Sequence, residues 1–146
     1  GEYYRLLQAV RNCGADNAKE WEEWILFILK GVEETSIETT AMIKAISKMM
    51  ADYKAVLKPL FGTTYKHELL NNLFFHPYTK IEFVCHDMGV QRKTGAKYLD
   101  MIVAAGLLNK IKIGRENYYI NERLFELFLN YSESVNTEDA DIIRTE

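Results

Sequence analysis

Few side chains in this sequence are of the types that do covalent or metal chemistry. They are three histidines and two cysteines, namely His67, His76, His86, Cys13 and Cys85. Cys85 and His86 are neighbours in a predicted helix, so their side chains point in different directions and do not form a nucleophile–base pair. No Cys-x-x-Cys or Cys/His spacing is present, and the pattern therefore predicts no metal ligand.

Phosphate-loop and acid–base chemistry have no support either. The eight glycines stand singly, so the sequence contains no glycine-rich phosphate loop. Glu20, Glu22 and Glu23 open a predicted helix, where the helix dipole favours acidic side chains, and no other carboxylate pair stands out. The sequence predicts no catalytic residue and no cofactor bound by this chain alone.

The middle of the chain has the charge to bind an anionic partner. Residues 76–121 carry seven Lys or Arg against four Asp or Glu, whereas residues 122–146 carry two against seven. Basic and amide side chains at the start of a recognition helix and on a wing are typical of contacts to DNA phosphates and base edges. The candidate nucleic-acid contacts are Gln91, Arg92, Lys93, Thr94, Lys97, Lys110, Lys112, Arg115 and Asn117.

Three short predicted helices must position these residues, and they extend over residues 65–75, 81–87 and 92–105. Gly89 lies in the turn between the second and third helices, where the backbone needs a positive φ, and Val90 fills the space between them. Ala96 is the small residue predicted to let these two helices approach closely. Gly106 follows the third helix at the position where glycine commonly ends one.

A hairpin follows the third helix. Residues 107–113 end in a strand-like alternation, residues 114–117 form a turn, residues 118–120 form the return strand, and Asn121 caps a helix over 122–130. Three helices and a hairpin in this order predict a mainly α fold, a winged helix-turn-helix with a small β-hairpin wing. Such domains bind proteins as well as DNA, and the acids Asp100 and Glu116 dilute the basic patch. Both alternatives stay open, with protein interaction favoured.

The N-terminal part of the chain is predicted to be helical. One helix covers residues 2–13, and a long one covers residues 19–58 with a kink between residues 31 and 36, where Thr and Ser weaken helix propensity. Its apolar stripe includes Ile46, Met49 and Tyr53, the candidate self-association face. A Pro and a Gly at residues 59 and 62 predict the domain junction. The predicted division is a helical segment over 1–60, the winged helix over 61–131 and a flexible acidic tail over 132–146.

Several phrases of the sequence resemble a known family. YYRLLQAVR at residues 3–11 and WEEWILF at residues 21–27 resemble the closing helices of the Fic domain. LLNNLFFHPYTKIEF at residues 69–83, GVQRKTGAKYL at 89–99 and GRENYYIN at 114–121 resemble the winged-helix extension that follows that domain in many bacterial Fic proteins. The resemblance covers the chain up to about Leu129.

The resemblance implies a parent enzyme that uses ATP and Mg²⁺ to move AMP onto a hydroxyl side chain of a target protein. The family signature, His-Pro-Phe and then Gly-Asn-Gly-Arg, is absent here. His76-Pro77-Tyr78 begins similarly but continues without the phosphate loop. The implied identity is a non-catalytic C-terminal fragment, whose winged helix serves in regulation, targeting or dimerisation. The expected partners are the target protein of the parent, a second copy of the chain, and DNA.

The alternative function is that of a DNA-binding winged-helix transcriptional regulator. Two features depart from the resemblance: Gln91 stands where relatives often have a capping Ser, and Gly95 stands where Ala is common, which costs up to ~1 kcal/mol of helix stability. The scattered cysteines and the lack of an apolar run of ~20 residues or a leader predict a reduced, cytoplasmic protein without membrane contact. The start at Gly1 is typical of the cut edge of a longer protein.

Overall fold

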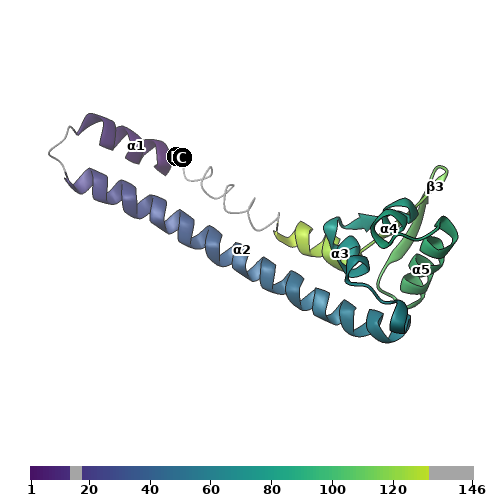
Figure 1. The fold of residues 1–146 in the computed structure, drawn as a ribbon. Coiled ribbons are helices and arrows are strands. Elements are labelled where there is room, and N and C mark those ends of the chain that lie inside the picture. The colour runs from purple at the N-terminus through teal and green to yellow at the C-terminus, as the bar shows by residue number, and fades with distance from the viewer. Residues whose placement is uncertain (14–17, 132–146) are drawn as a thin grey trace. The chain divides into compact units, whose positions relative to one another are not determined.

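The computed structural model describes residues 1–13 and 18–131 and confirms a mainly α chain with a small sheet (Figure 1). The predicted loop at 14–17 and the acidic tail at 132–146 lie outside the described residues. The chain divides into two compact units, and the one that holds the winged helix covers Lys44–Leu129. The elements in order are α1 (Glu2–Asn12), α2 (Ala18–Phe61), a 3₁₀ turn (Gly62–Thr64), α3 (His67–Phe75), β1 (Tyr78–Thr79), α4 (Ile81–Met88), α5 (Arg92–Ala104), β2 (Asn109–Ile113) and β3 (Glu116–Ile120), with a further helix over residues 122–131.

The first unit holds α1 and the N-terminal part of α2. Leu6 is its buried aliphatic residue, and aromatic side chains join the two helices. The ring centroids of Tyr3 and Trp24 lie 5.2 Å apart. The helix predicted over residues 2–13 is thus confirmed to within one residue.

The long helix extends past its predicted end. It is one α-helix from Ala18 to Phe61, so it does not end at the predicted residue 58. The hydroxyls of Thr35 and Ser36 donate back to carbonyls four residues earlier, at 2.9 and 2.6 Å, which satisfies them inside the helix. Pro59 removes one backbone donor, but Phe61 beyond it is buried in the core. Tertiary packing therefore continues the helix past the proline.

The C-terminal part of α2 is a wall of the winged-helix core. The compact unit begins at Lys44, so the predicted junction at residues 60–61 marks where the helix ends rather than where the packing unit begins. Tyr53 is fully buried, Met49 is 9% exposed, and Ile46 packs against the same cluster. The predicted self-association face is corrected for Met49 and Tyr53, which a partner could reach only by opening the core, whereas Ile46 stays partly exposed. A stripe spaced by three and four residues predicts a buried face but not what covers it.

The sheet has three antiparallel strands in the order β1-β3-β2. β1 was not predicted from the sequence; it pairs Tyr78 with Ile120. β3 begins at Glu116, so the hairpin turn contains only two residues, and its first, Gly114, has φ 61°. The predicted four-residue turn and shorter return strand were therefore wrong. The helix predicted from residue 65 begins at His67, after the 3₁₀ turn.

The turn predicted between α4 and α5 is confirmed, but the close contact between these two helices lies one residue earlier than predicted. Gly89 has φ 64° and ends α4, as its position predicted. The buried small residue of α5 is Gly95 rather than Ala96. A Cβ at residue 95 would lie 2.7 Å from the Sγ of Cys85 and 3.4 Å from the carbonyl oxygen of Ile81. The glycine thus has a packing role that offsets its cost in helix propensity.

This contact predicts that Gly95→Ala changes the free energy of unfolding in opposite directions in the natural chain and in a Cys85→Ala chain. In the natural chain the substitution should lower the free energy of unfolding by about 1 kcal/mol, because Cys85 or α5 must move. In a Cys85→Ala chain it should raise that free energy by about 0.5–1 kcal/mol, the helix propensity of alanine over glycine. Urea unfolding of the four chains measures both effects. The same sign in both backgrounds would show that the sulfur contact is not the reason for the glycine.

A buried polar network joins four parts of the winged-helix unit. The Tyr53 hydroxyl lies 2.8 Å from Oδ1 of Asn121 and 2.9 Å from the carbonyl oxygen of Leu107, and its hydrogen can be shared between them. Nδ2 of Asn121 donates to the carbonyl of Leu73, and Oδ1 accepts the backbone N–H of Leu124, which confirms the predicted N-cap. One side chain thus ties α2, α3 and the last helix together.

A second network anchors β1. The Thr79 hydroxyl donates to Oδ1 of Asn72 at 2.6 Å, and Nδ2 of Asn72 donates to a carboxylate oxygen of Asp87 at 2.6 Å. Asn72 and Thr79 are both buried. The two-residue strand is therefore held to α3 and α4 by side chains as well as by its pairing with β3.

Candidate functional site

The wing has two faces of opposite chemistry. Successive side chains of a strand point to opposite sides, so Lys110 and Lys112 share one face of β2, and Ile111 and Ile113 share the other. The ammonium of Lys110 lies 2.7 Å from the carboxylate of Asp100 on α5, which places the lysines on the side toward α5. We call the isoleucine side the outer face.

The outer face carries an apolar groove of about 430 Å³. Ile113 is 58% exposed and Ile111 is 39% exposed. The rings of Tyr78 and Tyr118, from β1 and β3, extend the apolar surface with centroids 5.7 Å apart. Adjoining exposed apolar side chains of this kind mark contact surfaces for proteins. The groove is lined by Pro77, Tyr78, Ile111, Ile113, Tyr118, Ile120, Glu122 and Phe125.

Sequence reasoning missed this groove, although a signal for it was present. The alternation Asn-Lys-Ile-Lys-Ile in β2 placed two isoleucines on one face of an expected hairpin. Because β1 was not predicted, the sequence did not show that Tyr78 extends this face. β2 is also an edge strand, and its two lysines disfavour pairing with a second β2 because like charges would meet. A partner is therefore accommodated by the face rather than by the edge.

The predicted nucleic-acid contacts are only partly brought together. Gln91, Arg92, Lys93 and Lys97 are exposed around the start of α5, and Thr94 is half-buried. On the wing, Lys112 and Arg115 are exposed and Asn117 is half-buried. Lys110 is engaged by Asp100, and the hydrogen bond between them raises the pKa of the lysine. Of the nine candidates, Arg92, Arg115 and Asn117 line one pocket.

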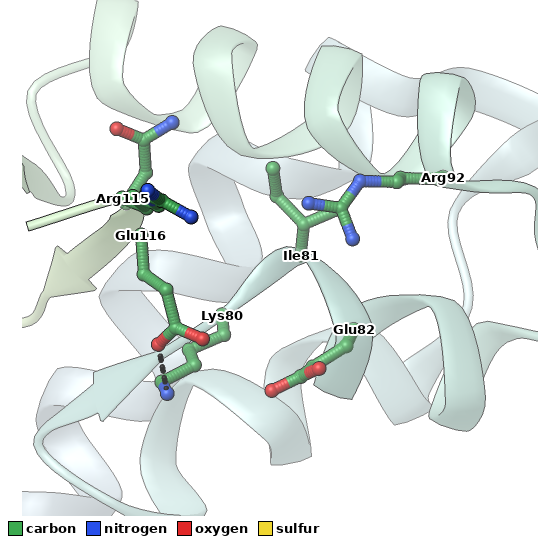
Figure 2. A pocket seen from close by; sticks show the side chains of 7 residues that line it. Lys80, Ile81, Glu82, Arg92, Arg115 and Glu116 are labelled. Carbon is green, nitrogen blue, oxygen red and sulfur yellow. Dashed lines mark hydrogen bonds and ion pairs between the residues drawn. The ribbon is translucent and has the colours of Figure 1, made fainter.

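That pocket lies where α4, α5 and the hairpin turn meet (Figure 2). It is small, about 80 Å³, and is completed by Lys80, Ile81, Glu82 and Glu116. The Lys80 ammonium lies 2.6 Å from the Glu116 carboxylate, and this hydrogen bond is the chief reason that the pKa of Glu116 is below its usual range. Lys80 was not predicted as a site residue, because it precedes α4 in a segment that was assigned to no element.

The histidines are placed as surface groups. His86 has an 89% exposed side chain whose Nδ1 lies 2.9 Å from the carboxylate of Asp87. His76 stacks against Tyr78 with centroids 6.0 Å apart. Within residues 1–13 and 18–131, no group of three His, Cys, Asp or Glu side chains could hold a metal ion. In the same part of the chain, no helix is long and apolar enough to cross a membrane.

A known protein family matches the part of the chain that carries both surfaces of the wing. The family model described as the C-terminal domain of SoFic-like protein adenylyltransferases matches residues 49–124. Among solved structures, the crystal structure of RV1404 from Mycobacterium tuberculosis is 17% identical, with 76% of this chain and 80% of that chain covered and a TM-score of 0.35. Staphylococcus aureus MarR in complex with salicylate and kanamycin is 12% identical, with 77% and 81% covered and a TM-score of 0.34. Neither structural likeness is close enough to carry an argument.

Proposed function

Because the chain belongs to the family of C-terminal domains of SoFic-like protein adenylyltransferases, we propose that it is a non-catalytic module that binds a protein partner of such an enzyme. The match confirms the resemblance seen in the sequence. The expected enzyme moves AMP from ATP, with Mg²⁺, to a hydroxyl side chain of a target protein. The sequence of this chain lacks the His-Pro-Phe and Gly-Asn-Gly-Arg signature that this transfer uses. A binding role is the contribution that its surface supports.

The observation that carries the proposal is the outer face of the wing sheet. It is apolar across strands β1, β2 and β3, and its isoleucines stay exposed rather than buried in the core. Polar residues on the outer face would be compatible with the fold, because the opposite face of the sheet packs on the core through the fully buried Tyr119. An enzyme that modifies proteins gains from a second surface that holds its substrate near the active site. We therefore assign the outer face to recognition of the target protein.

Photocrosslinking tests this assignment with the chain as it stands. A photoreactive phenylalanine analogue is placed at residue 113, in the outer face, and in a control chain at the exposed residue Ala55 of α2. In extract, the chain with the analogue at 113 should give a discrete adduct that the control lacks. Unlabelled natural chain should compete for it, and an Ile111→Asp chain should compete at least about tenfold less well, as expected for a central apolar contact.

Two results would contradict the proposal. Adducts of equal yield at residues 113 and 55 would show that the outer face has no preference for protein. Equal competition by the natural and Ile111→Asp chains would show that the adduct does not depend on the groove. Far-ultraviolet circular dichroism of the Ile111→Asp chain checks that its fold is retained, which is expected because the residue lies on the surface.

A further inference from the structure

The pocket of Figure 2 brings together two arginines from separate elements. Arg92 is the first residue of α5, and Arg115 lies in the hairpin turn. Their guanidinium groups extend into the same pocket from its two sides (Figure 2). Among the residues that the structure describes, neither guanidinium has an ion-pair partner, whereas Lys80 in the same pocket is held by Glu116. The pocket therefore has two guanidinium groups outside any ion pair, although Arg92 interacts electrostatically with Glu116, and their planar groups suit a tetrahedral anion.

The start of α5 adds to this preference for an anion. The N-cap residue Gln91 makes no side-chain capping hydrogen bond, and the first turn contains no acidic residue. Instead, Arg92 and Lys93 place two positive charges at the positive end of the helix dipole, which is unfavourable in isolation. An anion bound at the arginines would offset this repulsion.

Further basic side chains continue outward from the pocket. Lys93 and Lys97 are exposed on α5, and Lys112 is exposed on the face of β2 that is turned toward α5. A row of separate cations fits a polymer with repeated phosphates better than a single small anion. Gln91 and Arg92 at the tip of the helix are side chains that can also reach base edges in a major groove.

We propose that Arg92 and Arg115 bind one backbone phosphate of duplex DNA, with the start of α5 directed to the groove. The proposal goes beyond the protein-binding function, because neither arginine lines the outer groove. The two surfaces adjoin at Tyr118 of the groove, whose ring lies 4.5 Å from the Lys80 ammonium and whose hydroxyl lies 3.3 Å from the Glu116 carboxylate. Substitutions of the two arginines therefore test this proposal without changing a residue that lines the groove.

Fluorescence anisotropy with a short mixed-sequence duplex tests the site. At ~50 mM salt, an Arg92→Ala, Arg115→Ala chain should bind about tenfold or more weakly than the natural chain, and its log–log salt slope should be smaller by about 1, the contribution of one phosphate. A Lys44→Ala, Lys48→Ala chain is the matched control, because it removes the same charge from exposed positions of α2 and should bind like the natural chain. Arg92→Lys with Arg115→Lys should give an intermediate affinity, since charge stays but the paired donors are lost.

Glu116→Gln supplies a test of opposite sign. Removing this carboxylate takes a negative charge from the pocket and frees Lys80, so duplex affinity should rise. The proposal is overturned if the natural chain does not bind at ~50 mM salt, or if the Lys44/Lys48 control weakens binding as much as the arginine pair. It is also overturned if single-stranded RNA of equal length binds more tightly than the duplex. Binding of inorganic phosphate to the natural chain but not to the Arg92→Ala, Arg115→Ala chain, without any duplex binding, would also overturn the proposal and assign the pocket to a free anion.

Discussion

Asn121→Ala should lower the free energy of unfolding of the winged-helix unit by about 3 kcal/mol, from the loss of an N-cap and of a buried hydrogen-bonding side chain. Asn121 is 1% exposed, and its amide serves the Leu73 carbonyl, the Leu124 N–H and the Tyr53 hydroxyl together. Alanine can replace none of these bonds, and it leaves the buried Leu73 carbonyl without that donor. Urea unfolding followed by far-ultraviolet circular dichroism measures the change.

The matched variant is Tyr53→Phe, which removes one hydroxyl from the same network. It should cost about 1 kcal/mol, the usual net value of one hydrogen bond. The double variant should be less destabilised than the sum of the two, because both substitutions remove the same Tyr53–Asn121 bond. Amide hydrogen exchange should show the loss of protection in residues 65–121. An Asn121→Ala chain as stable as the natural one would mean that the network does not hold the unit together.

Asn72→Ala should lower the free energy of unfolding by about 2 kcal/mol, because it leaves the buried Thr79 hydroxyl without its acceptor and Oδ2 of Asp87 without its amide donor. The effect should depend on pH. His86 first, and then the Asn72 amide, hold the pKa of Asp87 below its usual range. A lowered pKa in the folded state stabilises the fold above the unfolded pKa, and this contribution disappears as pH falls through the folded value.

The stability difference between the natural chain and Asn72→Ala should therefore be constant near neutral pH and narrow below about pH 4. The narrowing should be modest, because the Asp87 side chain is 40% exposed and solvent screens it. Asn71→Ala is the control, since Asn71 is the exposed neighbour on the same helix and should change little. A difference that widens in acid would show that Asp87 does not receive its stabilisation from Asn72.

The elements with strong local signals were predictable from the sequence. Gly89 and Gly106 occupy positive-φ positions, with φ of 64° and 73°, and Asn121 caps its helix as its position indicated. The order of three helices and a hairpin is therefore set largely by turn and cap chemistry together with apolar periodicity. That order was enough for the winged helix-turn-helix and for the family resemblance.

The features that depend on tertiary contact were not predictable. β1 is two residues long and is held in place by its pairing with β3 and by the hydrogen bond of Thr79 to Asn72. It is too short for a run of strand-forming residues to predict it from the sequence. The helix α2 passes Pro59 because the core buries Phe61, which outweighs the local cost of the proline. The close approach of α4 and α5 falls at Gly95, since helix rotation about its axis decides which small residue faces the neighbour.

The candidate sites likewise combine features that the sequence predicts with features that only tertiary contacts create. Charge and position indicated Arg92 and Arg115, but only the folded hairpin shows that they share a pocket while Lys110 is committed to Asp100. The outer groove requires three strands in register and was missed for that reason. The apolar stripe at the C-terminal end of α2 was visible in the sequence, but only the structure shows that Met49 and Tyr53 are buried in the core of the same chain.

Labelled AMP incorporation into a target protein tests the central claim most directly. The isolated chain, given ATP and Mg²⁺, should transfer no AMP. When the isolated chain is added in excess to a full-length enzyme that carries this domain, it should occupy the docking surface of the target protein and so lower labelling of the target. An Ile113→Asp chain should not lower the labelling. Transfer by the isolated chain, or equal inhibition by the natural and Ile113→Asp chains, would contradict a non-catalytic module that binds the target through the outer face of its wing.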